Sequence, residues 1–394
     1  MPCSLFRNHK MREGHLIREI SPQNQRVFNS VRPSTFILVV TLCALSVGQE
    51  NFYPHNAVAC DRCHNLPREF GSSSMTVQRV GYLSREAFTP VAEGGIRHRF
   101  GESATSANPK TQTAGGRVSL SLLGDGFIEA IGDKEIAENA DQQRRRNDGI
   151  FGMVASAPVL EANGRPLVLR TGRFGWKNQH SSLMSSCADS LRNELGVRNR
   201  LYPDEYPTHA PGESPTPFDT SNPRTRKTEL DRLVDEIRHT APPLRDQNLA
   251  RTEAAQAGEK LFDGIGCAIC HVPTYKTLPP GTLINGGTYK IPKLLGNKII
   301  HPYSDFVLHD VGTGDGIPQA AKPEYLDQST ANKFRTPPLW ALRFRANHLM
   351  HDGDTPSPEQ AIKRHGGEAT KVRDRYELLS SEQKQQLLTF LSSL

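Results

Sequence analysis

The sequence predicts a mainly α-helical protein of two small helical domains, with long irregular loops and few strands. Three observations support this prediction. The 394 residues are enough for two domains of ordinary size. The 32 glycines and 28 prolines slightly exceed the usual share, which favours long irregular connections. The clearest apolar periodicities are helical and are bounded by capping residues.

Composition and charge exclude several classes of protein. With 36% hydrophobic and 23% charged residues, the chain is ordinary globular material and not a collagen, a coiled coil or a polytopic membrane protein. The net charge of +6 owes much to residues 1–48, where six basic residues face two acidic ones. The remainder is too weakly basic to predict a nucleic-acid partner. The arginines at 144–146 follow several acidic residues, and we expect a solvated face of mixed charge.

An export signal is predicted at the N-terminus. Residues 36–47 form a mostly apolar stretch of twelve, too short to span a bilayer comfortably but typical of a signal-peptide core. Ser46 and Gly48 are small residues suited to cleavage before Gln49. We therefore expect residues 1–48 to be a signal peptide or an uncleaved anchor, and the protein to be periplasmic or otherwise exported. A buried strand is the alternative.

Two Cys-x-x-Cys-His motifs carry the main chemical signal. They are Cys60-Asp-Arg-Cys63-His64 and Cys267-Ala-Ile-Cys270-His271. On a helical turn, positions i, i+3 and i+4 share a face. Two thiols can then bond to the vinyl groups of one haem while the following imidazole binds its iron, as in c-type cytochromes. The sequence thus predicts two covalent c-type haems.

Two other interpretations of the motifs remain. Zinc would find two three-ligand half-sites about 200 residues apart. A structural disulfide in each motif would leave the adjacent histidines unexplained. Cys187, outside both motifs, is expected to be a small buried side chain rather than a reactive thiol.

The spacing of the motifs implies two haem domains, each resembling a small cytochrome c. Residues 101–116 and 203–223 look like a loop and a proline-rich linker. An amphipathic helix carrying Leu230, Leu233, Val234 and Ile237 follows, and we place the boundary near Arg245. The domains are then 49–245 and 246–394. The second should contain helices that start after Thr252, Ser357 and Ser380, the last with Gln383 in a capping box.

His365 is a candidate iron ligand on spacing alone. It follows Ala361 and Ile362 by four and three residues on the short helix after Ser357, so it shares their inward face. A histidine facing the core of a haem domain could occupy the second axial position. A buried histidine that caps the helix end is an equally good interpretation.

Several strings resemble the di-haem oxidoreductase family, relatives of bacterial di-haem cytochrome c peroxidases and of MauG-type enzymes. The resemblance lies in the following stretches: Phe127-Ile-Glu-Ala-Ile, Asp148-Gly-Ile, Gly172-Arg-Phe-Gly-Trp-Lys, Gly266-Cys-Ala-Ile-Cys-His-Val-Pro, Pro302-Tyr-Ser-Asp-Phe-Val-Leu-His-Asp-Val-Gly, Phe334-Arg-Thr-Pro-Pro-Leu-Trp and Met350-His-Asp-Gly-Asp. They follow the family's order over nearly the whole exported chain.

The resemblance implies roles for the C-terminal haem, which should accept electrons from a donor. Its second ligand in relatives lies a fixed distance after His-Asp-Gly, and here that distance falls on His365, with Met350 as the fallback. Histidine in place of methionine should lower the potential of this haem. Arg335 and His351 are expected to contact the haem, with His351 near the propionates and not on the iron.

The N-terminal haem resembles the one that reacts with peroxide. No histidine occurs between Asn65 and Arg97, so a distal histidine ligand shortly after the motif is not expected. Glu129, alone among apolar neighbours, is the candidate acid–base residue with a raised pKa; a solvated helix glutamate is the alternative. Trp176 could carry electrons between the haems, or simply be a core residue.

The expected function is therefore reduction of hydrogen peroxide with electrons from a small donor protein, a cytochrome c or a cupredoxin. A di-haem electron carrier, an oxidase of another substrate and a haem-based sensor are the alternatives. Calcium lies between the domains in some relatives, but Ala346 and His348 stand where those relatives have threonine and proline.

Overall fold

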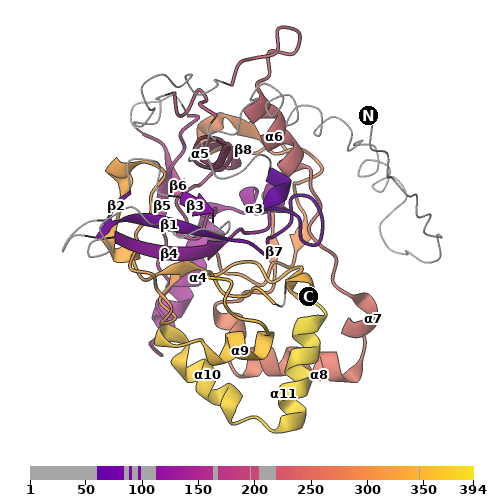
Figure 1. The fold of residues 1–394 in the computed structure, drawn as a ribbon. Helices are drawn as coiled ribbons and strands as arrows, with labels where there is room; N and C mark the ends of the chain where they lie inside the picture. The colour runs from indigo at the N-terminus through magenta and orange to yellow at the C-terminus, as the bar shows by residue number, and fades with distance from the viewer. Residues whose placement is uncertain are drawn as a thin grey trace, which may run out of the picture. The chain divides into compact units, whose positions relative to one another are not determined.

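The computed structural model describes residues 60–83, 88–90, 96–98, 112–162, 167–195, 197–203, 219–345 and 347–394. The predicted leader, residues 1–48, and most of the proline-rich segment lie outside these ranges. The described residues belong to one compact unit, so the division into two haem domains near Arg245 stays a prediction. The fold is helix-rich with few short strands, as predicted (Figure 1). Within the described ranges, no helix has both the length and the apolarity needed to cross a bilayer.

The helices fall into an earlier and a later group along the chain. The earlier helices are α3 (Asp125–Glu129), α4 (Asp133–Arg146), α5 (Leu183–Leu195) and α6 (Glu229–Arg238). The later helices are α7 (Gln247–Ala250), α8 (Glu253–Gly264), α9 (Pro358–Lys363), α10 (Thr370–Glu377) and α11 (Ser381–Ser392). Short 3₁₀ turns include η1 (Cys60–Arg62) and η2 (Cys267–Ile269), which carry the two cysteine motifs.

One antiparallel sheet stands out among the strands. It is built on β1 (Thr76–Leu83), which pairs with β4 (Gln112–Val118) along one edge and with β2 (Phe88–Pro90) and β3 (Ile96–His98) along the other. The remaining strands form two-residue or three-residue pairs: β5 (Ser156–Pro158) with β6 (Leu169–Thr171), β7 (Tyr275–Lys276) with β10 (Ile299–Ile300), β8 (Leu283–Ile284) with β9 (Tyr289–Lys290), and β11 (Leu308–His309) with β12 (Phe334–Arg335).

Strand β4 corrects the predicted loop over residues 101–116. The end of that stretch pairs with β1, whereas the residues before 112 lie outside the described ranges. The adjacent glycines Gly115 and Gly116 suggested a loop, but in this strand their lack of side chains leaves room for residues that pack against it. A Cβ at Gly115 would come within 2.6 Å of the Asp315 carboxylate. Tertiary pairing therefore overrides the weak local strand propensity.

The predicted C-terminal helices are confirmed. Thr252 caps α8, Ser357 caps α9, and Ser380 forms a capping box with Gln383 at the start of α11. Helices α8 and α11 lie against each other, with α9 and α10 nearby (Figure 1). The contact is close because Gly258 lacks a side chain: a Cβ there would lie 2.0 Å from the Gln386 carbonyl oxygen. The core of this region consists of Phe262, Ile265, Tyr303, Leu342, Leu349, Tyr376, Leu387, Phe390, Leu391 and Leu394.

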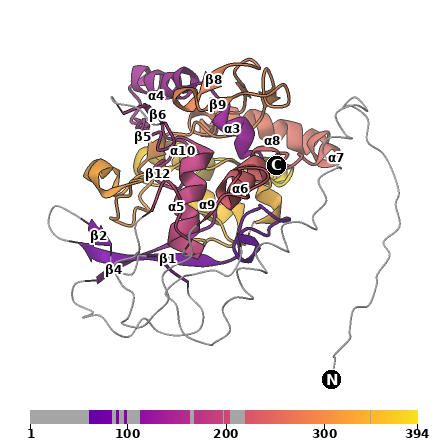
Figure 2. The ribbon, with the colours of Figure 1, turned by 90° about the horizontal axis from the view of Figure 1, so that it is seen from above.

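Helices α5 and α6 lie side by side in the earlier part of the chain (Figure 2). The predicted amphipathic helix is α6, and its apolar face is fully buried. Helix α3 packs on α6 so closely that a Cβ at Gly126 would meet the Arg238 carbonyl oxygen at 2.2 Å. These three helices form one wall beside the first cysteine motif.

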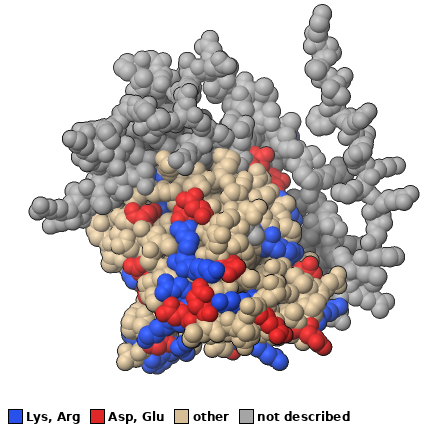
Figure 3. All heavy atoms as spheres, turned by 60° about the horizontal axis from the view of Figure 1, so that its bottom comes forward, with Lys and Arg blue, Asp and Glu red and all other residues tan. Residues whose placement is uncertain are grey.

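Charged side chains on the surface form mixed pairs. In α4, Arg144 bonds to Asp141 at 2.7 Å and Arg145 to Glu138 at 2.5 Å, which confirms the predicted mixed-charge face. On the face drawn in Figure 3, blue and red side chains are likewise interspersed.

Candidate functional site

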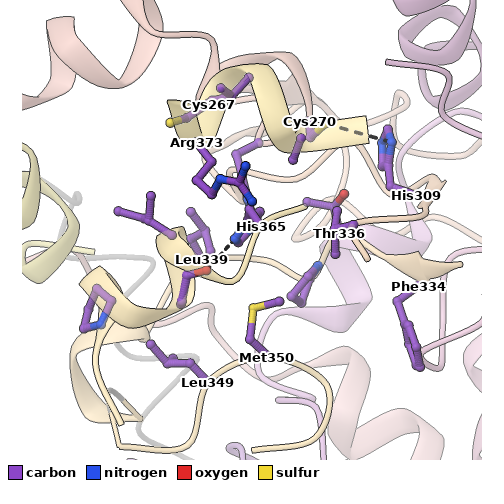
Figure 4. A pocket seen from close by; sticks show the side chains of 18 of the residues that line it. Cys267, Cys270, His309, Phe334, Thr336, Leu339, Leu349, Met350, His365 and Arg373 are labelled. Carbon is purple, nitrogen blue, oxygen red and sulfur yellow. Dashed lines mark hydrogen bonds between the residues drawn. The ribbon is translucent and has the colours of Figure 1, made fainter. Parts of the chain in front are cut away.

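A cavity surrounds the second cysteine motif. Helix α8 ends at Gly264, and Gly266, with a φ of 102°, turns the chain into η2. The His271 amide then donates to the Cys267 carbonyl. This turn presents Cys267, Cys270 and His271 to the cavity. Figure 4 labels the two cysteines among the lining side chains. The other residues that line it include Trp176, Phe334, Arg335, Arg345, Met350, His351 and His365.

His271 and His365 face each other across this cavity. Their ring centroids are 6.5 Å apart. Two metal–nitrogen bonds of about 2 Å, plus about 1 Å from each ring nitrogen to its centroid, would separate two axial imidazoles by about 6 Å. The pair therefore has the spacing that one iron between two histidines requires. Met350 also lines the cavity. Two rings lie against His271 among the described residues, those of Phe262 at 6.1 Å and His365, and of these only His365 offers a nitrogen to a metal.

The hydrogen bonds of these histidines leave the ligating atoms free. The Nδ1 of His271 lies 3.0 Å from the Tyr303 carbonyl oxygen, and that of His365 lies 2.6 Å from the Ala361 oxygen. Each Nδ1–H can donate to its carbonyl, which leaves Nε2 for a metal. Burial lowers the pKa of both rings, that of His271 to about 4, so both are neutral as ligands must be.

A second cavity surrounds the first cysteine motif. The turn η1 places Cys60 and Cys63 on its wall, and the His64 amide donates to the Cys60 carbonyl. The Nδ1 of His64 lies 3.0 Å from the Gly71 oxygen, so its Nε2 is free in the same way. Burial lowers the pKa of His64 as well. The polar residues that also line this cavity include Arg79, Arg117, Asp125, Gln179, His180, Asp189, Glu194, Gln319 and Arg335.

The two cavities differ in what lies opposite the motif histidine. His271 has His365 as its partner ring, whereas no aromatic or histidine ring is paired with His64 among the described residues. Among the described residues, no second ring is therefore placed to bind an iron that His64 would hold.

Neither motif brings its own two cysteines and histidine close enough together, among the described residues, to be three ligands of one zinc ion. In the described ranges, the only group of three His, Cys or acidic ligand atoms within 4.8 Å of one another is Cys270, Asp305 and His309. His309 in this group is already held between the carboxylates of Asp305 and Glu368, each at 2.8 Å. The charges of Cys270 and Asp305 outweigh burial and raise the pKa of His309. The described cysteines form no disulfide. The group also does not suit calcium, which prefers oxygen ligands.

Trp176 and Arg335 line both cavities. The indole of Trp176 is almost fully buried, as expected of a core residue, and donates its Nε1–H to the Val118 carbonyl at 2.7 Å. Its ring meets Phe334 edge to face at 6.0 Å. The Arg335 amide donates to the Trp176 carbonyl at 2.8 Å, so the two residues are joined through the backbone. Both interpretations of Trp176, bridge and core, are compatible with this position.

Buried arginines that form no ion pair within the described ranges suit a ligand that carries carboxylates. Arg335 is 4% exposed and Arg345 is 8% exposed, and the Nε of each has no hydrogen-bond partner among the described residues. Burial lowers the pKa of each to about 10, so both stay cationic at neutral pH. Haem propionates would neutralise them. Sequence reasoning missed Arg345, which no local pattern marks.

His351 contacts the protein with both ring nitrogens. Nε2 lies 2.6 Å from the Thr313 oxygen, Nδ1 lies 3.4 Å from the Gly116 oxygen, and the ring stacks on Phe334 at 3.8 Å. No ring nitrogen is left for iron, which agrees with the expectation that His351 is not a ligand.

The expected raised pKa of Glu129 is wrong. The side chain is fully buried, but its carboxylate accepts two hydrogen bonds from Arg238, at 2.7 and 3.1 Å, and one each from Leu183 and Asn285. These charges and donors outweigh burial and lower its pKa. Glu129 does not line the cavity of the first motif, whereas Asp125, one turn earlier, does.

Asp125 and Cys187 complete the first cavity. Asp125 is 6% exposed, and burial raises its pKa to about 7, against the attraction of Arg335. Sequence reasoning missed it, although a second carboxylate four residues before Glu129 was a visible signal. Cys187 is buried and its thiol pKa is raised by burial, as predicted.

These features define a protein with two cavities built around Cys-x-x-Cys-His turns and connected by shared residues. Residues 100–394 match the family described as "Di-haem oxidoreductase, putative peroxidase", and the chain belongs to this family. Haem is thus the cofactor that the family description implies. The matched range begins after Cys60 and His64, so the first motif stands outside it. No curated protein matches the chain.

Proposed function

We propose that the chain is an exported di-haem c-type cytochrome that reduces hydrogen peroxide to water, with electrons from a small redox protein such as a cytochrome c or a cupredoxin. The observation that carries the proposal is the asymmetry of the two cavities. One has a histidine pair spaced for a closed iron, and the other presents His64 without a partner ring. Electron transfer needs the first kind of site, and peroxide needs the second.

In this proposal the four motif cysteines hold two haems through thioether bonds. His271 and His365 are the ligands of the C-terminal iron, and His64 is the protein ligand of the N-terminal iron. When bound, the haems supply the redox chemistry. The chain's own residues bind the propionates through Arg335 and Arg345, keep water away from the C-terminal pair, and place Trp176 between the two groups.

The number of attached haems is the first test. Mature protein from a host with a c-type maturation system should retain two haems per chain by the pyridine haemochrome assay and by denaturing mass analysis. The double variant Cys60→Ser/Cys63→Ser and the double variant Cys267→Ser/Cys270→Ser should each retain one. Cys187→Ser, the matched control, should retain two. Colourless protein, or haem extracted by acid acetone, would contradict covalent attachment.

Peroxide turnover is the second test. A reduced small cytochrome should be oxidised on addition of peroxide, and spectra should show one low-spin and one high-spin haem. Two six-coordinate irons and no turnover would favour the alternative, a di-haem electron carrier or an oxidase of another substrate.

A further inference from the structure

Two carboxylates one turn apart on α3 have opposite surroundings. Glu129 accepts four hydrogen bonds and is paired with the buried Arg238. Asp125 is nine-tenths buried and lines the cavity of His64, yet neither of its carboxylate oxygens has a hydrogen bond or an ion pair among the described residues. The Asp125 carboxyl group is therefore open to the cavity instead of being fixed by neighbouring donors, with Arg335 and Glu129 as the charges that act on it.

We propose that Asp125 is the acid–base residue that moves protons on peroxide in the N-terminal cavity, and that Glu129 is a positioning residue whose fixed negative charge keeps Asp125 able to hold a proton. This inference rests on the proposed peroxidase function and assigns the proton transfer to a residue that the sequence did not single out. Pairs of carboxyl groups whose surroundings separate their proton affinities are a common acid–base arrangement.

The position of Asp125 is fixed by the backbone. Gly124, with φ 84°, begins α3, and its Cβ position would lie 2.9 Å from Pro242. Gly126 touches the backbone of Arg238, so α3 cannot shift on α6 without a clash. Asp125 therefore points into the cavity from a rigid support, as proton transfer requires.

The charges around Asp125 favour a group that exchanges protons near neutral pH. Burial and the Glu129 charge raise its pKa, the Arg335 charge lowers it, and the result is about 7. Other charged or titratable side chains line the same cavity: His64, Arg79, Arg117, His180, Asp189 and Glu194. Below pH 7 Asp125 is mostly protonated, and above it mostly ionised.

Proton transfer by Asp125 accompanies the breaking of the O–O bond of peroxide. Ionised Asp125 takes a proton from one peroxide oxygen and returns it to the other as the O–O bond breaks. Two electrons, delivered by the donor protein through the haems, reduce the two oxygens, and two protons taken up from solvent complete two water molecules. Arg335, which lines the same cavity, offers positive charge near the negative charge that develops on the departing oxygen.

The test compares Asp125→Asn with Asp141→Asn, an exposed carboxylate of α4, in the mature two-haem protein. General acid–base catalysis contributes about 10²–10⁴-fold, so Asp125→Asn should slow the reaction of peroxide by at least about 10²-fold. In the wild type, kcat/KM for peroxide should rise with pH through about 7, the pKa of Asp125, and this rise should vanish in Asp125→Asn. It should persist in Glu194→Gln, because burial and the Asp189 charge raise the pKa of Glu194 in the same cavity to about 7 as well. A pH profile unchanged in Asp125→Asn would overturn the proposal.

Two readouts do not depend on peroxide turnover. Infrared difference spectra between pH 6 and pH 8 should show a protonated carboxyl band that Asp125→Asn removes and Asp141→Asn keeps. Cyanide binds as an anion and releases its proton, which ionised Asp125 can accept. The pH profile of its affinity should therefore change slope near 7 in the wild type, and this change of slope should be absent in Asp125→Asn. A wild-type protein that does not turn over peroxide would contradict the proposed function. A wild-type protein without the protonated carboxyl band would contradict only the assignment of Asp125.

Discussion

Removing the charge of Glu129 should strongly destabilise the fold. In Glu129→Gln the side chain keeps its size, but an NH₂ group replaces one carboxylate oxygen. This NH₂ group cannot accept the hydrogen bonds that the oxygen accepted from the surrounding donors. Arg238, which is 6% exposed, then lies buried without its counter-charge. Breaking a buried ion pair by removing one partner costs about 3–5 kcal/mol. Total stabilities are about 5–15 kcal/mol, so this is a large share.

The assays are urea unfolding and thermal unfolding of the mature protein at pH 7, each followed by circular dichroism. The midpoint of thermal unfolding should fall by roughly 10 °C. Because the pKa of Glu129 is lowered in the folded state, its stabilisation is present above its usual value of 4.5 and is lost as pH falls through the folded value. The difference between wild type and variant should therefore shrink in acid.

The double variant Glu129→Leu/Arg238→Met is the control, since it removes both charges and should be less damaging than Glu129→Gln alone. A Glu129→Gln protein within about 1 kcal/mol of wild type at pH 7 would refute the reasoning, since a buried ion pair should cost more to break.

Three other predictions address the proposed ligands, the bridge and a pH-sensitive contact. His365→Met should raise the reduction potential of the C-terminal haem in a spectroelectrochemical titration, and an unchanged potential would argue against ligation by His365. Trp176→Phe keeps a ring but loses the hydrogen bond to Val118, so stopped-flow transfer between the haems should slow, at a stability cost of about 1 kcal/mol. His309 and two backbone amides lower the pKa of Glu368 to about 2, so its stabilisation exists above 4.5 and is lost as pH falls towards 2; Glu368→Gln should lower the thermal midpoint at pH 7 and change it little near pH 2.

Local sequence signals predicted the C-terminal region well. Capping residues predicted the starts of α8, α9 and α11 correctly. The i, i+4 spacing predicted that His365 faces inward, and it lies in the same cavity as His271. Capping and helical spacing involve residues within one or two turns of each other, so they can be recognised from the sequence alone.

Contacts between distant residues were not predictable. The pKa of Glu129 depends on Arg238, which lies 109 residues later, and its apolar neighbours gave no hint of that partner. In the same way, β4 looked like a loop until its pairing with β1 was known. In both cases, residues distant in the sequence determine a property that the neighbouring residues predicted wrongly.

The sharing of Trp176 and Arg335 limits how this protein could be divided. A fragment starting at residue 246 would lack the indole that forms part of its own cavity wall, and a fragment ending there would lack a guanidinium on its wall. Each half of the chain thus contributes a side chain to the cavity wall of the other half. Exchange of one half between relatives should therefore succeed only when both bordering side chains are transplanted together.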